Sequence, residues 1–243
     1  MHSAKKHLLA GSVAALVAGA ALWLAAPAHD ANAAMAKPSA GSIARAQAHI
    51  NAALNGGVLK TVGGAAVLDS DVLLKIYVFA YSKQPVDYSA ILTADTQAID
   101  TPEPVQPTAE QKQQIDRLLQ AARAHPTVLI RAREIALFPY DAADGGYRMQ
   151  NRIFAKLAGK GYFFDNSLYH FVYVDFAPFS VLHPADAATR KTVDAEIKDF
   201  EQFSLDIVGR VTAGGKDSIS IQPLNTTLKD NVGGTVMRQG APA

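Results

Sequence analysis

The chain has 243 residues, of which 49% are hydrophobic and 19% are charged, and it contains no cysteine. Its formal net charge is +1 at pH 7, with no local run of basic residues. The absence of cysteine excludes disulfide cross-links. The sequence also lacks the clustered positive charge with which nucleic-acid-binding proteins neutralise phosphates, so we expect no nucleic-acid partner.

The amino terminus has the three-part layout of a secretory signal peptide. Lys5 and Lys6 precede an uncharged apolar run, and a small-residue site ending at Ala33 follows. We therefore expect residues 1–33 to be a signal peptide, cleaved after Ala33, and the protein to be periplasmic or secreted, with no membrane partner after cleavage. The alternative is a retained anchor, because residues 8–28 approach the roughly 20 residues of a bilayer span.

Residues 34–100 are expected to form a helical N-terminal segment. Apolar residues recur at helical spacing over 42–54 and 71–82, with candidate cap residues before each run. The sequence also allows a short helical turn over 88–93. Between the first two helices, the apolar stretch 58–68 is interrupted by two glycines, which favours a loop or packed connector.

A proline-rich linker is expected over residues 101–107, because three of its seven residues are prolines, which stiffen the backbone and donate no amide hydrogen bond. An α+β domain over 108–243 should follow. Thr108 and Gln111 have the spacing of a capping box, and the helix that they begin should end at His125 and Pro126.

Beyond Pro126 the pattern of polarity changes from helical to alternating. It predicts strands over 127–137 and 168–176, and a hairpin whose strands, near 203–212 and 218–221, are joined by a glycine-containing turn. A helix is predicted over 184–201. Helices first and strands later is the pattern of an α+β fold, with a mainly antiparallel sheet that helices cover on one face.

No motif for catalysis or metal binding is visible. There is no nucleophile elbow, and no histidine outside the signal peptide has a second ligand at metal-binding spacing. The glycine-rich stretch 209–216 has the wrong spacing for a phosphate loop and is interpreted as part of the hairpin turn. We therefore assign no metal and no cofactor, and the catalytic residues, if any, are unknown.

Two arginines are the first candidates for binding. Arg131 and Arg133 lie two positions apart in the strand predicted over 127–137, so both should leave one sheet face together with Leu129 and Ile135. Two guanidinium groups there could hold a carboxylate or phosphate. The alternative is that they pair with acidic residues of neighbouring strands, such as Asp206, or point into solvent.

The second candidate is an aromatic stretch, since residues 162–182 hold eight of the chain's Phe and Tyr side chains. Both faces of the strand predicted there are mostly apolar, which favours a strand covered on both sides, with the aromatics filling the core. The alternative is a cleft in which the tyrosines join the arginines. Its residues would be Arg131, Arg133, Tyr140, Tyr169, Tyr173 and Asp175.

The sequence is therefore expected to encode an exported, periplasmic protein that acts as a non-enzymatic binding or envelope-associated interaction module. Its partner would be an unknown protein or small molecule of the cell envelope. Two alternatives stay open. One is a binder of a small anionic ligand through the Arg/Tyr sheet face, and the other is a hydrolase with an unrecognised Asp/His site, because catalytic groups can converge from distant positions.

Overall fold

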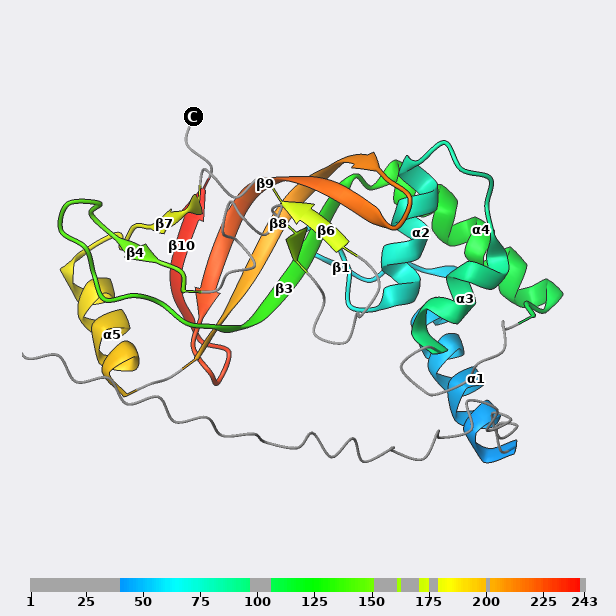
Figure 1. Cartoon of the computed structure of the whole chain (residues 1–243), viewed down its shortest axis with the longest axis horizontal. Coiled ribbons are helices and arrows are strands. Elements are labelled where there is room, and N and C mark those ends of the chain that lie inside the picture. The colour runs from blue at the N-terminus through cyan, green and yellow to red at the C-terminus, as the bar shows by residue number, and fades with distance from the viewer. Residues whose placement is uncertain are drawn as a thin grey trace, which may run out of the picture. The chain divides into compact units, whose positions relative to one another are not determined.

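Along the chain, most of the helices come before most of the strands of the sheet (Figure 1). The computed structural model describes residues 40–96, 106–150, 161–162, 171–174, 179–199 and 202–240. The helices are α1 (Ala40–Leu54), which continues into the 3-10 turn η1 (Asn55–Gly57), α2 (Asp71–Tyr81), α3 (Tyr88–Thr96), α4 (Ala109–Ala124) and α5 (Ala187–Lys198). None of the helices in these ranges is long and apolar enough to cross a membrane.

Side-chain caps set the first residue of four of the described helices, including α3, where the Asp87 carboxylate accepts a hydrogen bond from Ala90 N at 2.9 Å. The Ser70 hydroxyl accepts a hydrogen bond from Leu73 N before α2, and the Asp186 carboxylate does the same for α5. Thr108 and Gln111 form a complete capping box before α4, as the sequence predicts. Each cap satisfies an amide that has no partner inside its helix, so these boundaries follow from local sequence.

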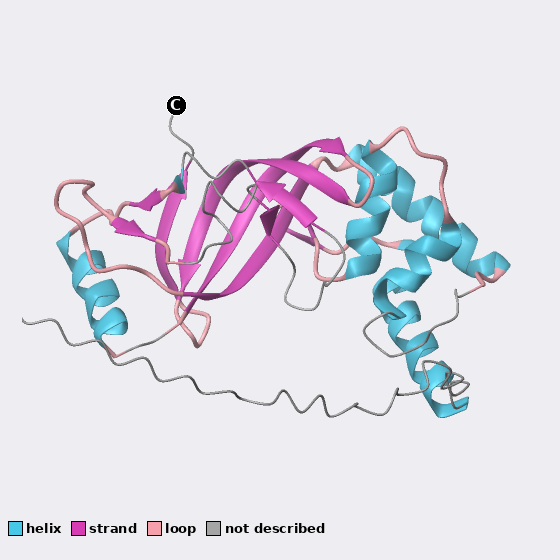
Figure 2. Cartoon of the chain, viewed as in Figure 1, coloured by secondary structure: helices cyan, strands magenta, loops and turns pink. Residues whose placement is uncertain are grey.

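The strands form one main sheet and one small sheet (Figure 2). In the main sheet the order is β1-β2-β3-β8-β9-β6-β5, and β10 also pairs with β9, while β4 and β7 pair separately. The strands are β1 (Thr61–Val62), β2 (Ala65–Val67), β3 (Thr127–Ile135), β4 (Tyr147–Arg148), β5 (Gly161–Tyr162), β6 (Phe171–Val174), β7 (Val181–Leu182), β8 (Phe203–Gly214), β9 (Ser218–Lys229) and β10 (Thr235–Gly240). The pairings are antiparallel except for β2 with β3 and β6 with β9. The predicted α+β class with a mainly antiparallel sheet is confirmed.

The prediction of a loop or connector over 58–68 is wrong, because this stretch forms the β1–β2 hairpin. Gly63 and Gly64 have φ values of 58° and 80°. Positive φ at both central residues is the requirement of the type I′ turn, whose twist matches that of the paired strands. Two glycines that look like an interruption in the sequence are the turn itself.

Strand β9 has different neighbours along its two halves. Its first half, up to Ile221, pairs in parallel with β6, and its second half, from Asn225, pairs with β10. Pro223 lies between the two segments and has no amide hydrogen to donate, as expected where a ladder changes partner. The predicted strand over 168–176 is extended at Phe171–Val174, and its other residues lie outside the described ranges.

A bulge interrupts the pairing of β3 with β8. Between Ala132 and Ile135, β3 has one residue more than the stretch of β8 that faces it. Glu134 sits in this bulge with a φ of 55°. The extra residue returns Ile135 to the buried face, where it is fully covered, so the prediction that Ile135 shares the face of Arg131 and Arg133 is wrong.

The two faces of the sheet differ in polarity. On one face of β3 and β8 the side chains are apolar and buried, and they belong to the same core cluster as residues of α1, α2 and α4. That face includes Val128, Ile130, Ala132, Leu205 and Ile207. The other face carries Arg131 opposite Asp206. Burial of the first face stabilises the fold and leaves the second for polar contacts.

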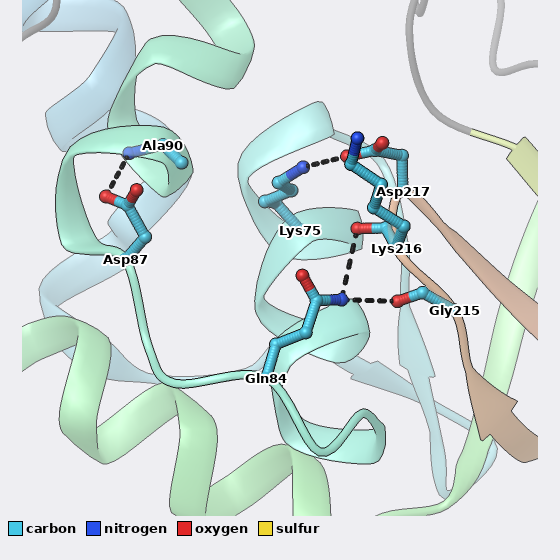
Figure 3. Close-up of polar contacts among 7 residues, drawn as sticks. All are labelled: Lys75, Gln84, Asp87, Ala90, Gly215, Lys216 and Asp217. Carbon is cyan, nitrogen blue, oxygen red and sulfur yellow. Dashed lines mark hydrogen bonds and ion pairs between the residues drawn. The ribbon is translucent and has the colours of Figure 1, made fainter.

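The turn between β8 and β9 is held by α2 and the loop after it (Figure 3). Lys75 of α2 forms an ion pair of 2.6 Å with Asp217, and Gln84 Nε2 donates to Gly215 O at 2.8 Å. The end of β8 approaches the helix so closely that a Cβ on Gly214 would lie 2.6–2.7 Å from backbone atoms of residues 78–82. These contacts fix the hairpin to the helical part of the core.

Candidate functional site

A buried carboxylate on the polar sheet face binds two cations. Arg131 Nε donates to Asp206 Oδ1 at 2.6 Å, and Arg131 Nη2 donates to Asp206 Oδ2 at 3.1 Å. Lys229 of β9 approaches Asp206 Oδ2 to 2.6 Å. The side chain of Asp206 is 10% exposed, whereas that of Arg131 is 48% exposed. The carboxylate therefore fixes the position of two basic groups that still reach solvent.

The protonation states follow from these contacts. Burial opposes ionisation of Asp206, but the hydrogen bonds from Arg131 and Lys229 outweigh it and hold the pKa of this carboxyl below its usual value. The same hydrogen bond to Asp206 raises the pKa of Arg131. Asp206 and Arg131 are therefore both charged at neutral pH and form an ion pair.

A cleft of about 400 Å³ lies beside this group, at the bulge between β3 and β8. Arg131 and Lys229 line the cleft, and so do Arg133 and Glu134 of the bulge. A non-glycine residue in the left-handed region costs about 1–2 kcal/mol, and such strain is retained where the surrounding structure requires it. The strained φ of Glu134 is thus found at the wall of the cleft.

The loop between β9 and β10 forms another part of the wall. Asp230, which lines the cleft, folds this loop by accepting hydrogen bonds at Oδ1 from Val232 N at 3.1 Å and Gly234 N at 2.6 Å. Val232 of this loop is 88% exposed, so hydrophobic burial of its side chain does not hold the loop in place. The loop is ordered by its own aspartate.

The structure brings together only part of the site predicted from the sequence. Arg131 and Arg133 both line the cleft. Tyr140 does not line it, because its ring packs under Arg190 of α5, with the guanidinium carbon 3.9 Å from the ring centroid. Tyr173 lies in β6, and no side chain is described there, while Tyr169 and Asp175 fall outside the described residues.

Three charged residues of the cleft are not among the residues predicted from the sequence. Lys229 and Asp230 are nearly a hundred positions from Arg131 and reach it only through the register of the long β8–β9 hairpin. Glu134 has the pattern of an ordinary strand residue, because no glycine or asparagine marks the bulge in the sequence. The signal in the sequence is a basic–acidic dipeptide, Arg133-Glu134 near the end of β3 and Lys229-Asp230 at the end of β9, but the sequence predicts no strand end at either place.

Within the described ranges, no three His, Asp or Glu side chains lie close enough together to hold a metal ion. The lining of the cleft consists mainly of charged and hydrogen-bonding residues. Comparisons of the chain with protein-family models, curated proteins and solved structures give no match.

Proposed function

We propose that this protein is an exported, non-enzymatic binding module that takes an anionic group of its partner into the cleft at the β3 bulge. One observation carries the proposal. Asp206 holds Arg131 and Lys229 side by side at a hollow of about 400 Å³ that Arg133 also lines. Basic groups fixed in this way lose little conformational freedom when an anion binds.

The donors suit a carboxylate or a phosphate. Lys229 carries three ammonium protons and directs one of them to Asp206. The planar guanidinium of an arginine can hold two oxygen atoms of one anion at once. The volume of the cleft falls within the range of sites for small molecules, so the bound group can belong to a small ligand or to an exposed end of a larger partner.

The proposal also includes the layout of the sheet. We take the helices to cover the apolar face, so that the polar face with Arg131 is the one presented to the partner. The tyrosines of the sequence prediction have no part in the proposed contact. Export is inferred from residues 1–33, which begin with two lysines, continue with an apolar run and end in a small-residue site at Ala33.

Calorimetric titration with inorganic phosphate and with acetate tests the proposal. We expect saturable binding that weakens as salt is added, because the contact is partly exposed and ionic. The variant Arg133→Gln should lose binding while keeping the fold, since the ion pairs of Asp206 with Arg131 and Lys229 stay intact in it.

Arg210→Gln is the matched control, because Arg210 is an exposed arginine of β8 that does not line the cleft. This control also separates binding in the cleft from weak association of anions with exposed arginines. The absence of saturable anion binding, or equal binding by the Arg133→Gln and Arg210→Gln variants, contradicts the proposed function.

A further inference from the structure

The walls of the cleft carry charges of both signs. Arg131, Arg133 and Lys229 are basic, whereas Glu134 and Asp230 are acidic, and the acidic Asp206 lies against two of the basic groups. The six charges balance. A cleft without net charge gives a ligand that is only anionic no long-range attraction, so its selectivity must come from the positions of the individual groups.

The acidic groups follow two of the basic ones directly in the sequence. Arg133 and Glu134 stand together at the end of β3, and Lys229 and Asp230 stand together at the end of β9. In a regular strand, consecutive side chains point to opposite faces, so only one member of each pair could line the same cleft.

The backbone at both places departs from a regular strand. Glu134 has a left-handed φ of 55°, and Asp230 is the first residue after β9, in a loop that its own carboxylate folds. Both departures have the same result, which is that Glu134 lines the cleft beside Arg133 and Asp230 lines it beside Lys229. Two different departures from regular strand geometry therefore place residues of opposite charge in pairs at the cleft.

We infer that the cleft binds a small zwitterion, whose anionic group meets Arg133 and Lys229 and whose ammonium group meets Glu134 and Asp230. This inference rests on the proposed anion site and adds the second charge. The ligand would be about the size of a dipeptide, given the volume of about 400 Å³. The shared chemistry has two sources, a free peptide and a phosphoethanolamine headgroup, which different probes distinguish.

The experiment is a calorimetric titration of the purified protein with matched probes. Dialanine carries both charges, N-acetyl-dialanine only the anion, and dialanine amide only the ammonium; phosphoethanolamine represents the headgroup. We expect at least one zwitterion to bind about fivefold more tightly than either single-charge dialanine probe, which is the effect of one partly exposed ion pair. Phosphoethanolamine binding without dialanine binding supports the inference and identifies the headgroup as the source.

The variant Glu134→Gln tests the acidic half of the site. It should remove the difference in affinity between dialanine and N-acetyl-dialanine, both measured on this variant, and it should not weaken binding of the N-acetylated probe, because it takes away a negative charge. Glu196→Gln, on α5 and outside the cleft, is the matched control and should change neither.

The outcomes separate the two proposals. If phosphate and N-acetyl-dialanine bind as tightly as both zwitterions, and Arg133→Gln abolishes that binding, the zwitterion inference is overturned and the anion site stands. If none of the probes binds, both are overturned.

Discussion

Arg131 and Asp206 lie directly opposite each other on β3 and β8, and the guanidinium donates two hydrogen bonds to the buried carboxylate. This pair is both a part of the sheet and the support of the cleft. A carboxylate that organises two cations should affect stability and binding together, because removing it releases Arg131 and Lys229 from their fixed positions.

We expect Asp206→Asn to lower the free energy of unfolding by about 2 kcal/mol, since it removes charge-assisted hydrogen bonds at a buried position. Urea denaturation measures this loss. The control is Asp69→Asn, whose ion pair with Lys60 is 3.7 Å long and exposed on both sides, and which should change stability by less than about 1 kcal/mol. Equal effects of the two substitutions would falsify the structural role of Asp206.

The pH dependence of stability should carry the same signature. The folded state lowers the pKa of Asp206, so its ionised form stabilises the fold above the pKa of the unfolded chain, which is near 3.9 for a free aspartate. This contribution is lost as the pH falls from about 4 through the lower pKa of the folded state. The free energy of unfolding of the Asp206→Asn variant should therefore decrease less steeply with falling pH than that of the wild type. Urea denaturation at a series of pH values measures it.

Glu134→Gly should raise the free energy of unfolding by about 0.5–1 kcal/mol. Glycine removes the cost of a left-handed φ, although its greater freedom in the unfolded chain offsets part of the gain. Thermal unfolding measures the change. Glu134→Gln separates the backbone effect from the loss of charge, and Gln222→Gly, at an exposed position inside β9, should destabilise the protein. A glycine variant at 134 that is less stable than the glutamine variant contradicts the strain.

Gly214→Ala should destabilise the protein by roughly 1–3 kcal/mol, the usual cost of overpacking. The added methyl group would meet backbone atoms of α2 and of Ser82, which cannot rotate away as a side chain can. Gly240→Ala is the matched control, because a Cβ there has no neighbour within 4 Å. Denaturation midpoints of the two variants measured in parallel decide the point, and a tolerated Gly214→Ala argues against the close approach of hairpin and helix.

Expression of the full chain in a Gram-negative host tests the inferred export. We expect the protein in the periplasmic fraction, with Ala34 as its first residue after cleavage. Intact-mass measurement gives the processed end directly. A chain that keeps residues 1–33 and sediments with the membranes would support the retained anchor instead.

The sequence predicted those elements whose signals are local. The capping box of Thr108 and Gln111 and the alternating polarity of β8 depend on neighbouring residues, and the structure contains both. The β1–β2 hairpin is not predicted, because Gly63 and Gly64 interrupt an apolar stretch, although a type I′ turn needs two such residues.

The candidate site was only half visible in the sequence. Arg131 and Arg133 could be placed on one face from their spacing, because side chains alternate along a strand. Lys229 could not be added, since its place beside Asp206 depends on the pairing register of a hairpin. Glu134 could not be added either, because a bulge formed without glycine leaves no mark in the amino-acid pattern.

The division of β9 between two partners has a consequence for motion. Its amides near Ser220 belong to a ladder with β6, and those near Thr227 to a ladder with β10, with Pro223 between them. The ladder with β10 at the cleft end of β9 can therefore open without breaking the ladder with β6, while β8 stays paired along both halves. Hydrogen exchange along this single strand would then show two rates, and a ligand in the cleft would slow only the second.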